Sequence, residues 1–379
     1  MEPVPESASW SGVVQVGRRI LQSVNTGGVF VVSGSYGAGH DAAADALTQR
    51  LRSAGHRVRR LDVAEELPWR IGALLRWLYF IQLRLLPGSW GSTLRFLQRD
   101  GWPLRLVRCL LGLLGRGLAA QVADATLVVS THPFASQALG EARARGALDV
   151  PVVTYLTDAS VHRLWVHGAV DLHLAIHELT AGQARALGGR TAVVRPVVAA
   201  VGVPSPLDWL APWPVDRPAA LVVGGSCGVG DLHQTAEDLL ATGLVTPVVA
   251  CGSNDRLRAQ LRDVPGIVAL GWRDDMAALV AAASCVVQNA GGMTSLEALA
   301  AGTPTITYRP IPGHGTTNAE VLHRAGLVPW ASDPADLPGV VARALLRSAP
   351  SGLPAGAPDV LETLERHALV APTPALVAA

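Results

Sequence analysis

Three glycine-rich loops each follow a short apolar run and precede a helix-like stretch of sequence. They occupy residues 33–40, 224–230 and 288–298. Glycine allows a tight turn and close approach of a ligand, and the start of a helix presents N–H groups that have no partner within the helix. The loops are therefore suited to an anion or a polar substrate. The first loop has neither the spacing of a dinucleotide fingerprint nor the Lys-Ser/Thr of a Walker loop.

The first loop contains Gly37 and Gly39 and ends in His40, at the expected start of a helix. The positive end of a helix dipole disfavours protonation of a histidine, and a neutral imidazole can act as a base. A histidine at this position is also common as a cap or packing residue. We treat His40 as a candidate general base.

The second and third loops are candidates for holding a nucleotide diphosphate. Gly224, Gly225 and Ser226 form the turn of the second loop. In the third, Gly291 and Gly292 are placed to bring backbone N–H groups onto a diphosphate. Glu297, about one helical turn further on, is placed to accept hydrogen bonds from ribose hydroxyls.

The charge of a leaving diphosphate needs a counterpart, and no Asp-x-Asp pair that would hold a divalent ion on it is evident. We therefore expect no bound metal and no other cofactor, with helix dipoles meeting this charge. Arg309 follows the apolar run 305–308 and is a candidate contributor. A surface arginine without such a role is the commoner situation.

Eight apolar runs of strand length position these loops, separated by helix-like sequence. They are residues 28–33, 126–130, 152–155, 219–223, 245–250, 267–270, 285–288 and 305–308. Continuous apolar runs are typical of buried parallel strands, and strand-helix alternation predicts right-handed crossovers with helices on both faces. The fold class is therefore α/β, with a doubly wound parallel sheet that occurs twice.

A proline-rich stretch, residues 196–218, separates the halves and predicts domains of residues 1–203 and 204–379. Two Rossmann-like domains facing each other would place both ligand-binding edges along one cleft. The helical sequence from about residue 336 onward could cover either domain.

Composition narrows the function. A net charge of +1 removes the main argument for a nucleic-acid partner. Four separated cysteines give no zinc or disulfide pattern, and neither a signal peptide nor an apolar run of bilayer length is evident. We expect a cytoplasmic protein.

The segment 68–119 departs from the alternation because it is helical in pattern and rich in arginine, including Arg76 and Arg84. Its apolar residues fall on one side of a helix at about 100° per residue. After Pro103 this pattern is repeated, with apolar residues at Leu104, Val107, Leu111, Leu114 and Leu118. An apolar face with a cationic border suits the surface of an anionic membrane. Ordinary packing helices with a solvated basic face would explain the same pattern.

Together these motifs resemble the GT-B glycosyltransferases of the monogalactosyldiacylglycerol synthase and processive diacylglycerol glucosyltransferase family. The peptidoglycan enzyme that transfers N-acetylglucosamine is a more distant relative. The likeness runs from about residue 28 to residue 345. It rests on the loops at 37–40 and 224–226, on a central group of residues, and on the region 271–318. The central group is Thr157, Asp158, His162, Trp165, Asp171 and Glu178; the later region includes Gly271, Trp272, Met276, Gly302, Pro304, Pro310, Gly313 and Asn318.

The resemblance implies an inverting, metal-independent transfer of a hexose from a UDP-sugar to a lipid such as diacylglycerol, by a peripheral protein on the cytoplasmic face of the membrane. It implies diphosphate contacts from Gly291, Gly292, Met293 and Thr294, and ribose contacts from Glu297. Backbone contacts from Gly271, Trp272 and Arg273 would bind uracil. His40 would lie near the acceptor hydroxyl with Gly37, Gly39, His162 and Trp165, while Asp158 would orient an imidazole or act as the base itself. A single base suffices for inversion.

Two departures from the family pattern affect the expected donor. Where the family has Pro-Gly-Gln-Glu at the hexose, this chain has Pro312, Gly313, His314 and Gly315, and the first domain ends in Val194-Arg195-Pro196. A UDP-sugar 2-epimerase, a transferase for a soluble natural product and a non-catalytic nucleotide-sugar-binding protein remain alternatives.

Overall fold

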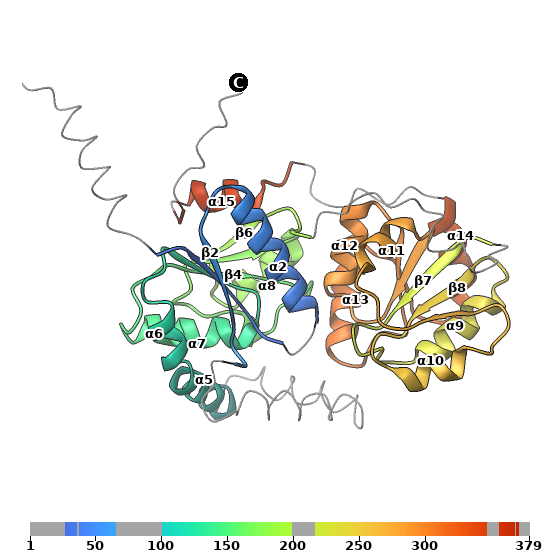
Figure 1. Cartoon of the computed structure of the whole chain (residues 1–379), viewed down its shortest axis with the longest axis horizontal. Helices are drawn as coiled ribbons and strands as arrows, with labels where there is room; N and C mark the ends of the chain where they lie inside the picture. The colour runs from blue at the N-terminus through green and yellow to red at the C-terminus, as the bar shows by residue number, and fades with distance from the viewer. Residues whose placement is uncertain are drawn as a thin grey trace, which may run out of the picture.

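The computed structural model describes residues 27–35, 38–65, 101–198, 217–346, 356–367 and 369–370. These residues form two α/β lobes that lie side by side (Figure 1). Gly37, Arg76, Arg84 and the proposed domain boundary at residues 203 and 204 lie outside the described residues.

The first lobe is built on a parallel sheet with the strand order β2-β1-β3-β4-β5-β6. The strands are β1 (Val29–Ser33), β2 (Val58–Asp62), β3 (Leu127–Ser130), β4 (Val152–Tyr155), β5 (Leu172–Ala175) and β6 (Thr191–Val193). The helices are α2 (Ala38–Ser53), α5 (Trp102–Leu114), α6 (Arg116–Gln121), α7 (Pro133–Ala144) and α8 (Glu178–Ala186), with a 3-10 turn at Arg163–Trp165. Alternate residues of β1 and β3 pack against α2 on one face and against α6 and α7 on the other.

The second lobe has a parallel sheet with the order β12-β11-β10-β7-β8-β9. Its strands are β7 (Ala219–Val223), β8 (Thr246–Ala250), β9 (Val268–Leu270), β10 (Cys285–Gln288), β11 (Thr305–Tyr308) and β12 (Trp330–Ala331). Its helices are α9 (Leu232–Ala241), α10 (Asp255–Leu261), α11 (Met276–Ala282), α12 (Met293–Ala301), α13 (His314–Arg324) and α14 (Leu337–Leu346), with a 3-10 turn at Pro334–Asp336. The two sheets confirm the predicted GT-B arrangement of doubly wound parallel sheets.

The final helix, α15 (Val360–Arg366), lies against the first lobe although it follows the second lobe in the chain (Figure 1). Val360, Leu361 and Leu364 are buried in the same apolar cluster as α2 and β1. Arg50 on α2 forms an ion pair with Asp359, and Arg195 donates its backbone N–H to the carbonyl of Pro358. The chain therefore returns to the lobe in which it began.

The lobes also contact each other directly. Met293 and Leu296 of α12 belong to the apolar cluster that contains the inner face of α2. A second cluster joins Ala159 of the first lobe to Leu299, Leu322 and their neighbours in the second. A β-carbon on Gly39 would lie only 3.3 Å from Met293 Cγ, so the start of α2 lies against the start of α12. We call this contact region between the lobes the seam.

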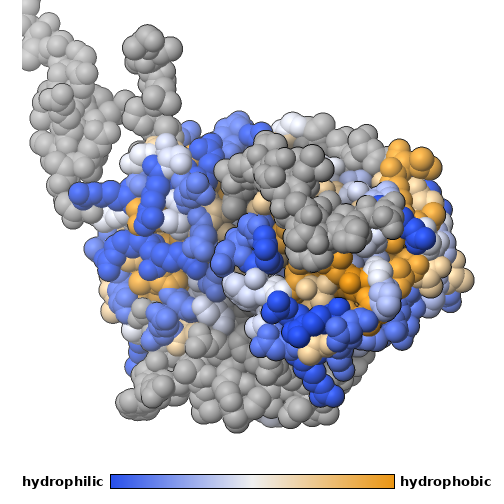
Figure 2. Space-filling model, turned by 45° about the vertical axis from the view of Figure 1, so that its right-hand side comes forward, coloured by the Kyte–Doolittle hydropathy of each residue, from blue (hydrophilic) through white to orange (hydrophobic). Residues whose placement is uncertain are grey.

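Hydrophilic residues cover much of the described surface in the view of Figure 2, with apolar areas between them. No helix among the described residues is both long and apolar enough to cross a membrane.

Candidate active site

His40 lies where the strand order of the first sheet reverses, between the loops that follow β1 and β3. Its Nδ1 is 2.9 Å from the carbonyl oxygen of Thr131 and 3.1 Å from the hydroxyl of Thr157. A carbonyl oxygen can only accept a hydrogen bond, so Nδ1 carries the proton and Nε2 keeps its lone pair. The structure shows no hydrogen bond from a described residue to Nε2.

The surroundings of His40 keep its imidazole neutral. Burial lowers its pKa and outweighs the opposing attraction of Asp158 and the hydrogen bond to Thr131. The His40 ring lies edge-on to His132, with 4.7 Å between the ring centroids, and 5.8 Å from the centroid of Trp165. A neutral imidazole with one fixed nitrogen and one open nitrogen has the properties of a general base.

Asp158 is a buried carboxylate in the loop after β4, and both of its oxygens have partners. Trp165 donates its indole N–H to Oδ2 at 3.1 Å, while Oδ1 lies 3.0 Å from Nε2 of His314. Asn318 donates a longer hydrogen bond of 3.4 Å to Oδ1. Burial alone would raise the pKa of Asp158, but the attraction and hydrogen bond of His314 hold it well below its usual range.

Asp158 therefore orients an imidazole, and that imidazole belongs to His314 in the second lobe. Burial would lower the pKa of His314, but its attraction and hydrogen bond to Asp158 prevail and the pKa is raised. The two groups form an ion pair across the seam. A carboxylate fixed in this way is a weak base, so the geometry favours His40 over Asp158 for deprotonating a substrate.

Asn318 on α13 joins the two lobes around this ion pair. Its Oδ1 accepts hydrogen bonds from the N–H and the hydroxyl of Ser160, at 2.8 and 2.7 Å. Its Nδ2 donates to the carbonyl of Ala290 at 3.0 Å, in the loop that leads into α12. A single buried amide thus connects the loop after β4 to the loop after β10.

His162 extends the cluster of imidazoles. Its ring centroid lies 6.1 Å from those of both Trp165 and His314. Burial, reinforced by repulsion from His314, lowers the pKa of His162 to about 3. Asp158 is therefore surrounded by one charged imidazole and by others that stay neutral.

The glycine loops of the second lobe meet at the strand-order reversal between β7 and β10. A β-carbon on Gly230 (φ 90°) would lie 2.3 Å from Nδ2 of Asn289, which donates to the carbonyl of Val229. Gly225 also has positive φ, at 71°. The close approach of the two loops requires glycine at position 230, whereas at Gly225 the positive φ alone favours glycine.

Gly291 has a different role from the one predicted for it. Its N–H donates to the side-chain oxygen of Gln288, as does that of Ala290. The N–H of Gly291 is therefore not available to a diphosphate in this arrangement. Its φ of 71° and the proximity of Asn318, whose Cβ would lie 2.7 Å from an added β-carbon, explain the need for glycine. The backbone at Gly292, Met293 and Thr294, at the start of α12, remains the candidate anion site.

Asp158 lies beside this helix start, because a β-carbon on Gly292 would be 3.8 Å from its Oδ1. Glu297, one turn further along α12, has no hydrogen bond or ion pair to any described residue. Burial raises the pKa of Glu297 to about 7. Glu297 is thus a carboxyl group with unused hydrogen-bonding capacity, and its contact with ribose stays a prediction.

Three other predicted donor residues already have partners. Trp272, which is 58% exposed, donates its indole N–H to Asp274, and Arg273 pairs with Asp275. Arg309 has a positive φ of 46° and forms ion pairs with Asp231 and Asp238 of the segment leading into α9 and of α9 itself. Its positive charge is therefore balanced within the second lobe.

Several buried groups at the site were not singled out from the sequence. Thr131 and His132 follow β3, and Ser160 follows Asp158 by two residues. Their positions at the ends of parallel strands were the available signal, since such ends meet at one edge of a sheet.

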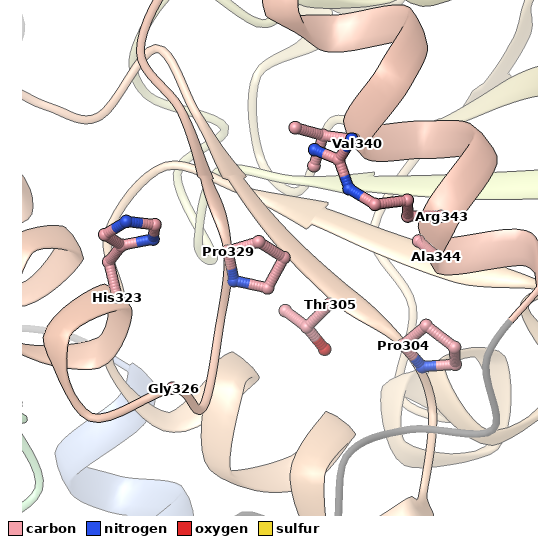
Figure 3. Close-up of a pocket in the computed structure, with 8 residues that line it drawn as sticks. All are labelled: Pro304, Thr305, His323, Gly326, Pro329, Val340, Arg343 and Ala344. Carbon is pink, nitrogen blue, oxygen red and sulfur yellow. The ribbon is translucent and has the colours of Figure 1, made fainter.

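A separate pocket, with a volume of about 180 Å³, lies at the opposite edge of the second sheet. It is lined at the start of β11 by Pro304 and Thr305, and Figure 3 shows His323 and Arg343 on opposite sides of it. It does not contact the loops at the seam. Within the described residues, no group of three or more His, Cys, Asp or Glu side chains is arranged to hold a metal ion.

Two sequence families match the chain, one in each lobe. The monogalactosyldiacylglycerol (MGDG) synthase family matches residues 40–201, and the glycosyltransferase family 28 C-terminal domain matches residues 219–348. The fold and the matched domains define the protein as a glycosyltransferase with the GT-B fold. More particularly, its first lobe is similar to MGDG synthases and its second lobe to the C-terminal domain of glycosyltransferase family 28.

Known proteins agree with this assignment. A processive diacylglycerol beta-glucosyltransferase of Bacillus cereus is 25% identical over 337 residues, covering 79% of this chain and 80% of that protein. Among the curated relatives, the alignments cover between 56% and 80% of the relative's length. Acinetobacter baumannii MurG is similar in structure, with a TM-score of 0.51, 17% identity, and coverage of 90% of this chain and 97% of that chain. A Medicago truncatula glycosyltransferase complexed with UDP-glucose has a TM-score of 0.54 and 12% identity, covering 87% and 93%.

Proposed function

We propose that the protein transfers a hexose from a UDP-sugar to a lipid acceptor, with inversion at the anomeric carbon, using His40 as general base. The observation that carries this proposal is the convergence at the seam of an open, neutral imidazole and the start of α12. The first group suits an acceptor hydroxyl and the second suits a diphosphate.

The proposed step needs one base. The oxygen of the acceptor hydroxyl bonds to the anomeric carbon as the bond from that carbon to the diphosphate oxygen breaks. The departing UDP takes the bonding electron pair, and the hydroxyl proton passes to Nε2 of His40. Helix N-termini at α12 and α13 lie where negative charge develops on UDP.

The lipid acceptor is proposed on two grounds. The curated relatives are named diacylglycerol glucosyltransferases. In addition, α5 exposes an apolar stripe formed by Trp102 (70% exposed), Leu106 (49%), Leu110 (48%) and Leu113 (45%). These four residues fall within about 80° of one another on a helical wheel. We name them the α5 stripe and propose that it rests on the cytoplasmic face of the membrane.

The stripe differs from the apolar face predicted for this region. Leu104, Leu111 and Leu118 are buried, so they form the packing side of α5 and α6 and cannot face a membrane. Arg108 points inward as well, since it donates to Gln137 and to the carbonyl of Val166. Interpreting the predicted face as membrane-facing was therefore wrong for these residues, because they complete the interior of the first lobe.

Product analysis tests the proposal. The protein is incubated with a panel of UDP-sugars and either diacylglycerol or total bacterial lipid, and products are analysed by mass spectrometry and NMR. We expect a hexosyl lipid whose anomeric configuration is opposite to that of the donor. Conversion of UDP-N-acetylglucosamine to UDP-N-acetylmannosamine without acceptor would identify an epimerase instead. UDP binding that Glu297→Ala abolishes, without transfer to any lipid, would identify a non-catalytic binding protein.

A further inference from the structure

The ion pair between Asp158 and His314 uses only one of the two nitrogens of the His314 imidazole. Nε2 of His314 donates to Asp158 at 3.0 Å, and the structure shows no hydrogen bond from a described residue to its Nδ1. About a quarter of the His314 side chain is exposed. A protonated imidazole carries a hydrogen on each nitrogen, so an N–H donor with positive charge is available at the seam.

The position of this N–H donor favours an anion. His314 is the first residue of α13, where the helix dipole is positive, and Gly313 before it adopts a φ of 89°. Its partner Asp158 lies beside the start of α12, the candidate diphosphate site. Two helix N-termini and one imidazolium therefore converge on the same region, which contains one carboxylate.

Asp158 fixes the imidazole in this arrangement. Trp165 holds the carboxylate through Oδ2, the oxygen that does not face His314, and Asn318 donates to Oδ1 beside His314, so the carboxylate can orient the ring without moving. A carboxylate that holds one ring nitrogen while the other faces a ligand is the arrangement by which proteins set the tautomer and orientation of a working histidine.

We propose that His314, held through Nε2 by Asp158, donates a hydrogen bond from Nδ1 to a negatively charged oxygen of the nucleotide sugar. This charged hydrogen bond stabilises the negative charge of that oxygen in the bound state. The inference rests on the proposed function, because it assumes that a nucleotide sugar enters the seam. The negatively charged oxygen belongs either to the diphosphate or to a carboxylate on the sugar, as in a uronic acid. His314 keeps its proton during transfer, while the acceptor proton passes to His40.

Binding measurements distinguish the two sources. Dissociation constants of wild type and His314→Gln are measured by calorimetry for uridine, UDP, UDP-glucose and UDP-glucuronate. A charge-assisted hydrogen bond predicts a loss of between about ten- and a hundred-fold. An equal loss for all three diphosphates, with uridine unaffected, assigns the contact to the diphosphate. A loss confined to UDP-glucuronate assigns it to the sugar carboxylate.

His323→Gln provides the control, because His323 lies at the opposite end of the same helix and contacts the backbone N–H of Trp330. It should leave all four constants unchanged. Unchanged constants in His314→Gln would overturn the inference, as would an equal loss for uridine, which indicates general damage to the site. If wild type binds no uridine nucleotide, the proposed function itself fails. If wild type binds UDP and transfers sugar while His314→Gln behaves identically, only the present inference fails.

The pH dependence of binding supplies a readout that a merely structural role would not change. Above pH 7 the terminal phosphate of UDP is largely ionised, with a pKa of about 6. The groups facing His314 are Asp158, already ionised, and His40 and His162, both neutral because burial lowers their pKa. We expect the difference in UDP affinity between wild type and His314→Gln to shrink as pH rises from 7 upward, because His314 loses its proton as the pH passes its raised pKa. Glu297 also titrates at the edge of this pH range, because its pKa is about 7. Both proteins contain Glu297, so its effect cancels in the difference between their UDP affinities. A constant difference would contradict a charged His314.

Discussion

His40 and Asp158 differ in the chemistry that their surroundings permit. The imidazole of His40 has one nitrogen fixed by Thr131 and one open, whereas both oxygens of Asp158 have donors. A base must have an open lone pair, and of the two residues only His40 has one. Burial lowers the pKa of His40, so its imidazole is neutral and can accept a proton. The two residues therefore have complementary roles, one in proton transfer and one in holding a positive charge in place.

Replacing His40 tests its role as base. We expect His40→Gln to lower kcat by about 10²- to 10⁴-fold, the usual contribution of a general base. UDP affinity should change little, because the proton transfer is made only to the acceptor hydroxyl. Transfer is measured with radiolabelled donor, and His233→Gln, at a partly exposed residue of α9, is the control. A kcat within a factor of three of wild type would exclude His40 as the base.

The sequence predicted His40 and Asp158 as site residues, but not the partner of Asp158. His40 lies in the first turn of a helix that follows a strand and a short glycine loop, so local pattern was sufficient to single it out. Asp158 and His314 belong to different lobes, and their contact depends on how the lobes pack at the seam. The role of Gly291 was mispredicted for a related reason, since periodicity does not show that Gln288 turns back onto the loop.

At the scale of elements, α5 presents two apolar faces. One packs into the first lobe through Leu104 and Leu111, and the opposite one is the exposed α5 stripe. Isolated apolar residues on a surface are ordinary, but four exposed on one helix face form a patch of the kind found at binding surfaces. Arg105 and Arg116 are exposed near its two ends, as expected at an anionic lipid surface.

Vesicle binding tests the α5 stripe. We expect the double variant Leu106→Ser/Leu110→Ser to bind vesicles of phosphatidylcholine and phosphatidylglycerol at least about ten-fold more weakly, because burial of each leucine contributes about 1.5 to 3 kcal/mol. Leu346→Ser removes another exposed leucine, on α14, and should have no effect. Binding is measured by co-sedimentation. Equal binding by all three proteins would show that the stripe does not contact lipid.

All eight predicted strands are present, and four further strands were missed for identifiable reasons. The edge strand β2 contains two arginines and an aspartate, and most of it is only partly buried. Two more of the missed strands, β6 and β12, are also edge strands and have only three and two residues. Strand β5 is buried, but its four residues include His173, which interrupts the apolar run. Apolar runs mark strands buried on both faces, and edge strands carry a weaker signal.

At the scale of the whole molecule, buried histidines couple stability to pH. Burial lowers the pKa of His40 and His167, lowers that of His132 well below 6.5, and lowers those of His162 and His173 to about 3 and 4. At these five histidines the unfolded chain therefore binds more protons than the folded chain below about pH 6.5, so their contribution to stability falls as pH falls. His314 acts in the opposite direction, because its raised pKa adds stability that is lost as pH rises through its folded-state value.

Thermal unfolding tests this balance. Five histidine pKa values are lowered, whereas those of His314 and Glu297 are raised and act in the opposite direction, so we expect Tm to fall on balance between pH 7 and pH 4.5. His173→Gln should reduce the slope, because the buried Nε2 of His173 has no partner and resists protonation. Differential scanning fluorimetry of both proteins across this range measures the effect. A Tm that is constant or rises on acidification would contradict the assignment of neutral buried histidines.

The return of α15 to the first lobe also affects how the protein can be divided. The first lobe is a discontinuous folding unit, because residues 359–364 complete an interior formed by residues near the amino terminus. Cutting the chain once, between residues 198 and 217, would leave the first lobe with an uncovered apolar surface and the second with an unattached helix. Isolated lobes are better obtained by joining the α15 segment to the end of the first lobe and ending the second lobe after α14.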